Sequence, residues 1–589
     1  MKLKKIITCT LAACLCLTAA GCNANQDKEL EKQMLATAPD YSKYTHQYDF
    51  YGYSGPSDGY WTEDEMRYYA GEDFRTVENY RDYKNSGMTI YLPQTDARVS
   101  KGNGREPWST FTDEIWQARE DEWAASKVFW DRAYEAGLNK IIMTDTQIQM
   151  WSETQHGMLV RPADEPAVPG EESPYVFESE AELDAGIAKC LETYIDHPGF
   201  YGVMLKDEPG YSCVEAYGQT YRAIKRVAQN VYHRDIFVQH NLLPMRTYGA
   251  GAYNLMPLLE WFEKDESEYT ISPKEYYDLV GGVWADEVVA PQEQLAKILE
   301  EELVAHGNNR PAVTAAKFEK YIEGFALSMG SDYIQFDDYP LRGTEDNPSV
   351  MDVYIREMQV TANVAKKLGI DYYMVTQSFA TTENDVAVHR VCSKEDCYWL
   401  NNTLLAFGVS QISYYTYFAK SSNVASHFNL NEGSFVTRNG EKTDIYYYYQ
   451  QIMAENQKFA PVKLNFKYQG SRVYNQLPLN FNGKYMSPEW VDNTYVFQEL
   501  KDISVNKESV LITESYDSEN QKYMYCVQNI VDAVNKGSLS FQTTTLQFDS
   551  AKYKFVAIYR NGERTLQALD NGKVIIKNAA GQAAFVIPY

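Results

Sequence analysis

Positive charge is scarce in this sequence. In 589 residues, 55 lysines and arginines stand against 81 aspartates and glutamates, which gives a formal net charge of −26. Nucleic-acid binding depends on clustered lysine and arginine side chains that neutralise phosphates. The acidic balance therefore argues against nucleic acid as a partner, whereas a neutral ligand such as a sugar is compatible with it.

Cofactor motifs are missing as well. No GxGxxG or Walker pattern follows an expected strand, so a nucleotide cofactor is not predicted. No CxxC or Cys/His cluster has the spacing of zinc ligands, and neither a metal nor another cofactor is expected. Beyond the N-terminal region the cysteines are Cys190, Cys213, Cys392, Cys397 and Cys526. Five thiols cannot all pair internally; Cys392 and Cys397 are nearest in sequence, although no bridge between them is predicted.

The N-terminus has the pattern of a secretory signal. Three lysines among the first five residues precede an apolar stretch to Ala20, which is too short for a stable spanning helix. The following AAGC resembles a bacterial lipobox, so residues 1–21 are predicted to be removed and Cys22 to be lipidated. Residues 22–45 would form a polar tether to the cell membrane, on its extracytoplasmic side. Cleavage by an ordinary signal peptidase is the alternative.

From about residue 47, short apolar or aromatic runs alternate with amphipathic stretches that end in glycine. Runs with the pattern of strands lie near residues 48–56, 88–95, 139–146, 200–209, 236–243, 331–340, 371–379 and 411–418. Alternating strands and helices imply a parallel sheet with right-handed crossovers. Eight such units predict an α/β fold, a (β/α)8 TIM barrel over residues 46–462, with an insertion at about 245–312. A doubly wound open sheet is the alternative, which the lack of a glycine-rich phosphate turn disfavours.

The pattern of the sequence changes after the helix that is expected to close the barrel. From residue 463 to 589 it consists of short alternating runs such as SVLITESYD and LSFQTTTLQF, broken by Asn, Asp and Gly. Period-2 alternation at this spacing predicts an antiparallel β-sandwich. We expect this sandwich to be an accessory domain.

The fourth expected strand, FYGVMLKDEP, ends in the acids Asp207 and Glu208. In barrels of this kind, chemistry lies at the C-terminal ends of the strands. Because side chains alternate along a strand, Met204, Lys206 and Glu208 are expected to face the barrel axis. Glu208 is therefore predicted to stand half-buried at the barrel mouth, an environment that suits a general acid. The alternative is that both acids only cap the next helix, where negative charge is favourable.

A second carboxylate is expected on the sixth strand, because glycoside cleavage usually takes two carboxylates that flank the bond. In SDYIQFDDYP, alternation points Tyr333, Gln335 and Asp337 inward. Asp337 is the predicted partner of Glu208, with Asp338 in reserve. Strand-end acids can also be structural and bind backbone amides. A second DEP, at residues 164–166, follows no strand and is expected to be a loop.

Polar groups at the other strand ends are candidates for binding sugar hydroxyls. Together with Asp207 and Asp338, these are Asp145, His240, Asn241, Gln377, Tyr415 and Tyr417. Each of them is individually as compatible with packing at the rim as with binding.

Several of these segments together resemble a group of secreted bacterial glycoside-hydrolase-like barrels. They are the strand-four DEP, the D-x-Y-P of strand six, the strand-seven VTQSF and LLAFGVSQISYYTYF near the barrel's end. Those proteins carry a C-terminal β-sandwich and are related to the clan with Asn-Glu-Pro on strand four; the resemblance covers roughly residues 47 to 589. It implies that Glu208 matches the clan's acid/base position. The clan's nucleophile is a Glu that ends strand seven, where this sequence has Gln377.

Two functions remain in view. One is a lipid-anchored glycoside hydrolase in which Glu208 protonates the leaving oxygen and Asp337 activates water. The other is a non-catalytic glycan-binding lipoprotein on the same barrel, which the Gln377 substitution and the 48 tyrosines favour. A purely structural surface protein is a third, weaker option. The sugar, the linkage and the stereochemical outcome are not determined by the sequence.

Overall fold

The structure is a computed structural model of the chain and describes residues 28–589 with gaps. The long gaps are 246–309, 476–490 and 533–540, and the short ones are 34–35, 37, 58, 63–66, 71–72, 94–97, 155–156, 171, 345–347, 352, 384–385, 420, 424–427, 430–433, 438 and 507–508. The expected signal peptide, Cys22 and most of the expected insertion thus lie outside the described residues.

The centre of the molecule is built from two parallel sheets. The larger contains β1 (Asp49–Gly52), β13 (Gln411–Tyr415), β10 (Asp371–Gln377) and β7 (Tyr333–Asp337), in that order. All three of its strand pairs are parallel. The smaller contains β4 (Ile141–Thr144), β5 (Phe200–Asp207) and β6 (Phe237–Asn241), again parallel. Each of these strands falls within a run that the sequence predicted.

Main-chain contacts join the two sheets at both of their edges. A parallel bridge pairs Leu242, just after β6, with Phe336 of β7. On the other side, the expected strand near 88–95 contributes a parallel bridge from Tyr91 to Ile141 of β4. The neighbouring Ile90 donates its N–H to the main-chain oxygen of Phe50 in β1 at 3.0 Å.

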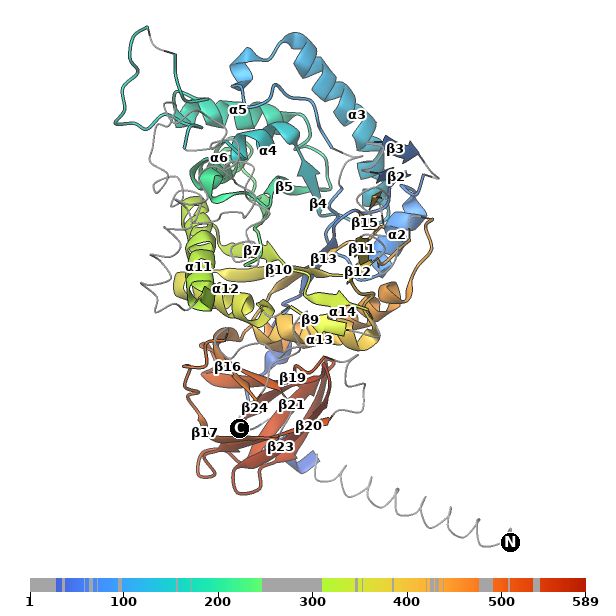
Figure 1. The fold of residues 1–589 in the computed structure, drawn as a ribbon, viewed down its shortest axis with the longest axis vertical. Coiled ribbons are helices and arrows are strands. Elements are labelled where there is room, and N and C mark those ends of the chain that lie inside the picture. Colours follow the sequence, from blue (N-terminus) through green and yellow to red (C-terminus); the bar gives the residue numbers. More distant parts are fainter. Residues whose placement is uncertain are drawn as a thin grey trace, which may run out of the picture.

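Helices lie around these sheets and follow the strands along the chain (Figure 1). They are α2 (Val77–Asn85), α3 (Asp113–Glu135), α4 (Thr146–Ser152), α5 (Glu180–Glu192), α6 (Val214–Asn230), α11 (Arg310–Met329), α12 (Tyr354–Leu368), α13 (Lys394–Ala406) and α14 (Asp444–Lys463), with 3-10 turns η1 (Tyr41–Lys43), η2 (Trp108–Thr110) and η3 (Tyr211–Cys213). Side-chain caps begin several of them; Ser179 starts α5 by accepting from the N–H of Glu182. In α6, buried Tyr217, Tyr221 and Ile224 recur at helical spacing and form the face that packs inward.

The two faces of the parallel strands belong to different clusters of buried apolar side chains. In β5, Val203 and Leu205 belong to the large core shared with the helices. Met204 belongs to a separate inner cluster with Tyr51, Tyr53 and Val375. The alternation expected for the first part of this strand is therefore confirmed.

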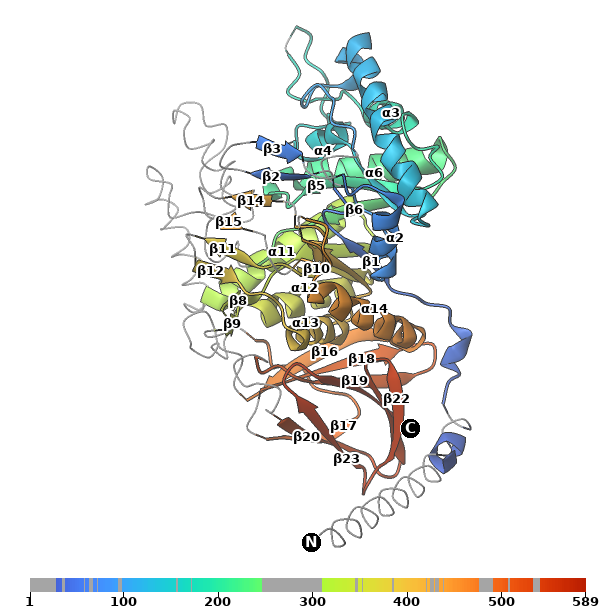
Figure 2. The same ribbon diagram turned by 90° about the vertical axis from the view of Figure 1, so that its right-hand side faces the viewer.

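A further sheet is formed by the loops that leave the larger parallel sheet. Its strands, in order, are β3 (Arg67–Ala70), β2 (Gly59–Thr62), β14 (Ser421–Asn423), β15 (Phe428–Asn429), β11 (Thr381–Glu383), β12 (Val386–His389), β8 (Leu341–Gly343) and β9 (Pro348–Val350). Along the chain, β2 and β3 follow β1, and β8 and β9 follow β7. In the same way β11 and β12 follow β10, and β14 and β15 follow β13. We call this the rim sheet; Figure 2 shows it along one side of the molecule. The sequence patterns do not predict this sheet.

The C-terminal region consists of two antiparallel sheets. The six-stranded one contains β16 (Lys467–Tyr474), β18 (Val510–Asp517), β19 (Lys522–Asn529), β24 (Ala583–Pro588), β21 (Phe555–Arg560) and β22 (Glu563–Ala568), and the three-stranded one contains β17 (Leu500–Val505), β20 (Phe541–Phe548) and β23 (Lys573–Ala579). Val510 and Ile512 of the first share an apolar core with Leu546 and Ile576 of the second. The pair of sheets lies beneath α12, α13 and α14 (Figure 1).

Two further features concern the described residues. Cys190, Cys213, Cys392, Cys397 and Cys526 are all free and buried. Within the described part of the chain, no helix combines the length and the apolar character needed to cross a bilayer.

Candidate active site

The site begins with an irregularity in β5. Met204 pairs with Gln239 of β6, but the next pair joins Asp207 to Asn241, so that two residues of β5 lie opposite one residue of β6. This is a β-bulge, which inserts one extra residue and re-aims the side chains that follow. As a result Asp207, rather than Glu208, takes the inward position after Met204.

The carboxyl of Asp207 is close enough to that of Asp337, at the end of β7, for the two charges to interact. Burial, and secondarily the charge of Asp337, raise the pKa of Asp207 to about 7. The amide Nδ2 of Asn241 donates to Asp207 Oδ1 at 3.1 Å, which acts against that rise. Asp337 itself is only 2% exposed. Because β6 separates the two strands, their main chains are roughly 9–10 Å apart, twice the usual strand spacing.

Tyr339 lies near enough to both Asp337 and Glu208 to be affected by their charges. Burial raises the pKa of Tyr339 well above its usual value, and the charges of Asp337 and Glu208 raise it further. The interaction between its hydroxyl and the carboxyl of Asp337 contributes in the same direction. A phenol held protonated in this way remains a hydrogen-bond donor at neutral pH.

Glu208 does not occupy the half-buried, inward place that strict alternation predicted. It is exposed, has a φ of +49°, and donates its main-chain N–H to the oxygen of Asn241 at 3.0 Å. The reason is the bulge, because the extra residue shifts the inward positions by one. Its assignment as general acid remains a prediction.

Below the acids, polar side chains bind one another. Gln239 donates to the hydroxyl of Tyr53 at 2.8 Å. Gln335 donates to the hydroxyl of Tyr51 at 2.9 Å. These groups are fully or almost fully buried.

Aromatic rings form a wall next to Asp337. Tyr339 contacts Phe379 edge to face, with ring centroids 4.8 Å apart, and contacts Tyr415 at 5.6 Å. Tyr53 packs against Tyr415 from the other side at 6.1 Å. Tyr339 and Tyr415 are only half-buried, so their rings are the part of the wall that a ligand can reach.

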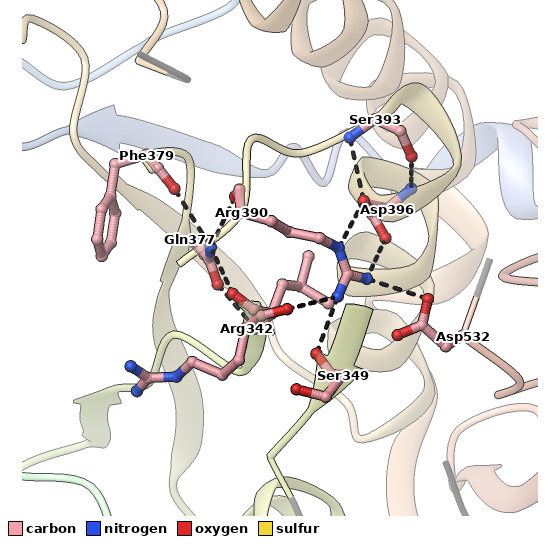
Figure 3. A network of polar contacts seen from close by, with 9 residues as sticks. Arg342, Ser349, Gln377, Phe379, Arg390, Ser393, Asp396 and Asp532 are labelled. Atoms are coloured by element: carbon pink, nitrogen blue, oxygen red, sulfur yellow. Dashed lines mark hydrogen bonds and ion pairs between the residues drawn. The ribbon is translucent and has the colours of Figure 1, made fainter. Parts of the chain in front are cut away.

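Gln377 ends β10 but does not present its amide to this space (Figure 3). Its Oε1 accepts from the N–H of Leu341 at 2.9 Å, and its Nε2 donates to the oxygens of Leu341, Phe379 and Arg390 at 3.1 to 3.4 Å. The side chain is fully buried. At the place of the clan's expected nucleophile, the chain therefore has a side chain that holds loops together.

Two other candidates are engaged away from the acids. Asp145 forms a buried ion pair with Arg119 at 2.6 Å, accepts from the hydroxyl of Tyr194 at 3.0 Å and caps α4. His240 stacks on Tyr333 with centroids 4.3 Å apart, and burial lowers its pKa to about 3. Their burial favours structural roles.

Asp338 and Tyr417 also lie apart from the acids. Asp338 is fully buried, and its charge is felt by Tyr354 of α12, on the helix side of the sheet. Tyr417 packs against Tyr83 of α2 at 4.6 Å. Of the predicted site residues, the structure thus brings together Asp207, Glu208, Asn241, Asp337 and Tyr415.

Tyr53, Tyr339 and Phe379 were not proposed as site residues from the sequence. Tyr339 stands two positions after Asp337 in the D-x-Y-P motif, so the alternation rule that selected Asp337 could have selected it too. Phe379 carried no comparable signal, because it lies beyond the end of β10. Among the described residues, no group of His, Cys, Asp and Glu is arranged to hold a metal ion.

Comparison with known proteins gives the following picture. No protein-family model and no curated protein matches the chain. It is similar to a solved family 30 subfamily 8 glycoside hydrolase, the xylanase Xyn30A from Clostridium acetobutylicum, with 12% identity over 92% of this chain and 97% of that chain and a TM-score of 0.32. It is also similar to a family 27 β-L-arabinopyranosidase from Geobacillus stearothermophilus, with 10% identity over 93% and 97% and a TM-score of 0.39. A third is a GH5_18 protein from Bifidobacterium longum subsp. infantis, with 10% identity over 70% and 79% and a TM-score of 0.35.

Proposed function

We propose that the protein is a glycoside hydrolase that acts on an extracellular oligo- or polysaccharide, with Asp207 as general acid and Asp337 as the second carboxylate. The observation that carries this proposal is the pair itself: two inward carboxyls at the ends of parallel strands, one of them with a pKa raised to about 7. Two neighbouring carboxyls whose environments differ provide an acid and a base at the same pH.

We place this pair at the mouth of a (β/α)8 barrel followed by a β-sandwich. The contacts at both edges of the two parallel sheets, from Leu242 to Phe336 and from Tyr91 to Ile141, support a closed ring of eight strands. In such barrels the C-terminal ends of the strands carry the chemistry.

The proton transfers follow from the surroundings of each acid. Near neutral pH a large fraction of Asp207 is protonated, and it gives this proton to the leaving glycosidic oxygen as the bond breaks. Asp337, which lies near the protonated hydroxyl of Tyr339, takes a proton from the attacking water or attacks the sugar itself. A carboxyl separation of about 6.5–9.5 Å would give inversion and one of about 5–5.5 Å retention.

The half-buried rings of Tyr339 and Tyr415 are suited to the apolar C–H faces of sugars. Exposed Glu208 lies beside this wall and is placed to bind sugar hydroxyls. Three carboxyls near one another favour a neutral glycan over an acidic one, because like charges repel.

The test is turnover of a broad panel of polysaccharides and aryl glycosides by the purified protein. We expect at least one to be cleaved, and Asp337→Asn to lower that rate by about 10² to 10⁴ with an unchanged circular dichroism spectrum. Cleavage at the wild-type rate by Asp337→Asn would refute the assignment of this pair.

The second candidate function is a glycan-binding protein without turnover. The observation that favours it is Gln377, since the amide at the clan's nucleophile position is bound to main-chain groups. Binding of several glycans by calorimetry, with none cleaved over days, would select this function.

We also propose that the protein is anchored by a lipid on Cys22 to the outer face of the bacterial cell membrane, as AAGC suggests. Cys22→Ser should then release the protein from the membrane fraction or leave its precursor unprocessed. Membrane association that persists in this variant after salt washing would contradict the anchor.

A further inference from the structure

Arg390 lies directly after β12, is 2% exposed, and has its guanidinium surrounded by acceptors (Figure 3). Nε and one terminal nitrogen donate to the two carboxylate oxygens of Asp396 at 3.2 and 2.8 Å. The same terminal nitrogen donates to Asp532 at 3.2 Å. The other donates to the main-chain oxygens of Ser349 and Arg342 at 2.8 and 3.2 Å.

These acceptors come from three separate parts of the protein. Asp396 stands in the first turn of α13, where a capping box with Ser393 already fixes its position. Asp532 follows β19 in the C-terminal antiparallel region. Arg342 and Ser349 face each other in the β8–β9 hairpin of the rim sheet.

The hairpin leads directly to the proposed active site. Tyr339 is separated from β8 only by Pro340, whose ring fixes its own φ. Leu341, the first residue of β8, is held on both its N–H and its oxygen by the amide of Gln377. The next residue, Arg342, is held by the Arg390 guanidinium. Tyr339 is thus placed by a short, doubly anchored segment.

The carboxylate of Asp532 does more than neutralise the charge of Arg390. Asp396 alone neutralises the guanidinium and binds it in bidentate geometry. Asp532 adds a further acceptor from another part of the chain and restricts how the guanidinium can turn toward the hairpin.

We infer that Arg390 is a positioning residue of the site. Its ion pair with Asp532 holds the β8–β9 hairpin and thereby keeps the hydroxyl of Tyr339 near Asp337. Through Asp532, the C-terminal region contributes to the site. This inference rests on the proposed function for its catalytic consequence, although the ordering of the hairpin does not depend on any reaction.

The experiment compares Asp532→Asn, Tyr339→Phe and the double variant. If Asp532 acts through Tyr339, each single variant should lower kcat about tenfold with little change in KM, and the double variant should be no slower than the slower single variant. The control is Glu563→Gln, which removes an exposed ion pair with Lys458 between α14 and β22 at 2.8 Å. It should leave kcat unchanged.

Hydrogen exchange measures the hairpin without any substrate. Peptides that contain Leu341 should exchange at least tenfold faster in Asp532→Asn than in wild type or Glu563→Gln, while peptides from β5 exchange at the wild-type rate. Arg390→Lys, which keeps the charge but loses the planar fork, should show the same local change if Asp532→Asn does not fold.

The outcomes separate the two proposals. If no glycan is cleaved but the hairpin is loosened as described, the proposed function fails and the positioning role of Arg390 stands. Unchanged exchange at Leu341 in both Asp532→Asn and Arg390→Lys overturns the inference. Fully multiplicative kcat effects of Asp532→Asn and Tyr339→Phe overturn it as well.

Discussion

Asp207 and Asp337 lie on strands separated by β6, yet the charge of Asp337 helps to raise the pKa of Asp207 to about 7. The bulge in β5 produces this relationship by turning Asp207 inward. The residue that the motif marks as the acid, Glu208, is left at the exposed edge of the same site.

The two adjacent acids should respond differently to neutralisation. Asp207→Asn should lower kcat by about 10² to 10⁴, because the buried proton donor is lost. Glu208→Gln should change KM more than kcat, because its carboxylate is exposed. Both rates are measured on the same substrate, with the folded fraction checked by circular dichroism. A collapse of kcat in Glu208→Gln alone would return the acid role to the motif residue.

The pH dependence of activity should reflect Asp207. Burial, and then the charge of Asp337, raise its pKa from 3.8 to about 7. Only the protonated form can act as general acid, so kcat should fall about tenfold per pH unit well above 7. A pH–rate profile measures this, and a basic limb that begins only above about pH 9 would exclude Asp207 as the acid.

The same raised pKa should appear in stability. Between about pH 4 and 7 the folded state holds a proton on Asp207 that the unfolded state releases. Folding binds a proton in this range, so this group's contribution is most favourable below pH 4 and decreases as the pH rises to 7. Asp207→Asn should gain stability relative to wild type as the pH rises from 4 to 8, measured by urea denaturation. An equal difference at both pH values would contradict the raised pKa.

Asp145 provides a test of a structural role. Its ion pair with Arg119 is at 2.6 Å, with both side chains fully buried. Removing one partner of a buried pair costs about 3–5 kcal/mol. Asp145→Asn retains a good helix cap for α4. It should therefore lower the free energy of unfolding by roughly this amount, while KM, measured at low temperature, stays close to the wild-type value. A selective rise in KM at unchanged stability would instead support the sugar-binding role predicted from the sequence.

Placing the clan's carboxylate at position 377 should raise neither the activity nor the stability of the protein. The Nε2 of Gln377 donates to three main-chain oxygens, so the carboxylate oxygen that replaces it in Gln377→Glu would face acceptors only. Leaving such groups unsatisfied costs about 1–3 kcal/mol. We expect a lower thermal midpoint and no increase in kcat. Gln377→Met, which is similar in size and lacks the charge, is the matched control, and a gain of activity in Gln377→Glu alone would show that residue 377 reaches the substrate.

Local patterns in the sequence determined the elements of the fold. Apolar runs such as SDYIQFDDYP and the glycine-terminated amphipathic stretches predicted β7, α12 and their counterparts, because the side-chain periods of strands and helices differ. The same reasoning predicted that Met204 faces inward and that the chain after residue 463 is antiparallel. It also placed Asp337 on the inner face, where its charge reaches Asp207.

Tertiary structure decided which acid enters the site and what surrounds it. The bulge that exchanges Glu208 for Asp207 depends on the register between β5 and β6, which no local pattern records. The rim sheet joins strands from four separate loops, including β2 with the distant β14, and the contact of Arg390 with Asp532 spans 142 positions. Such pairings depend on which chain segments meet in space, whereas hydrophobic periodicity reports only how each segment is buried.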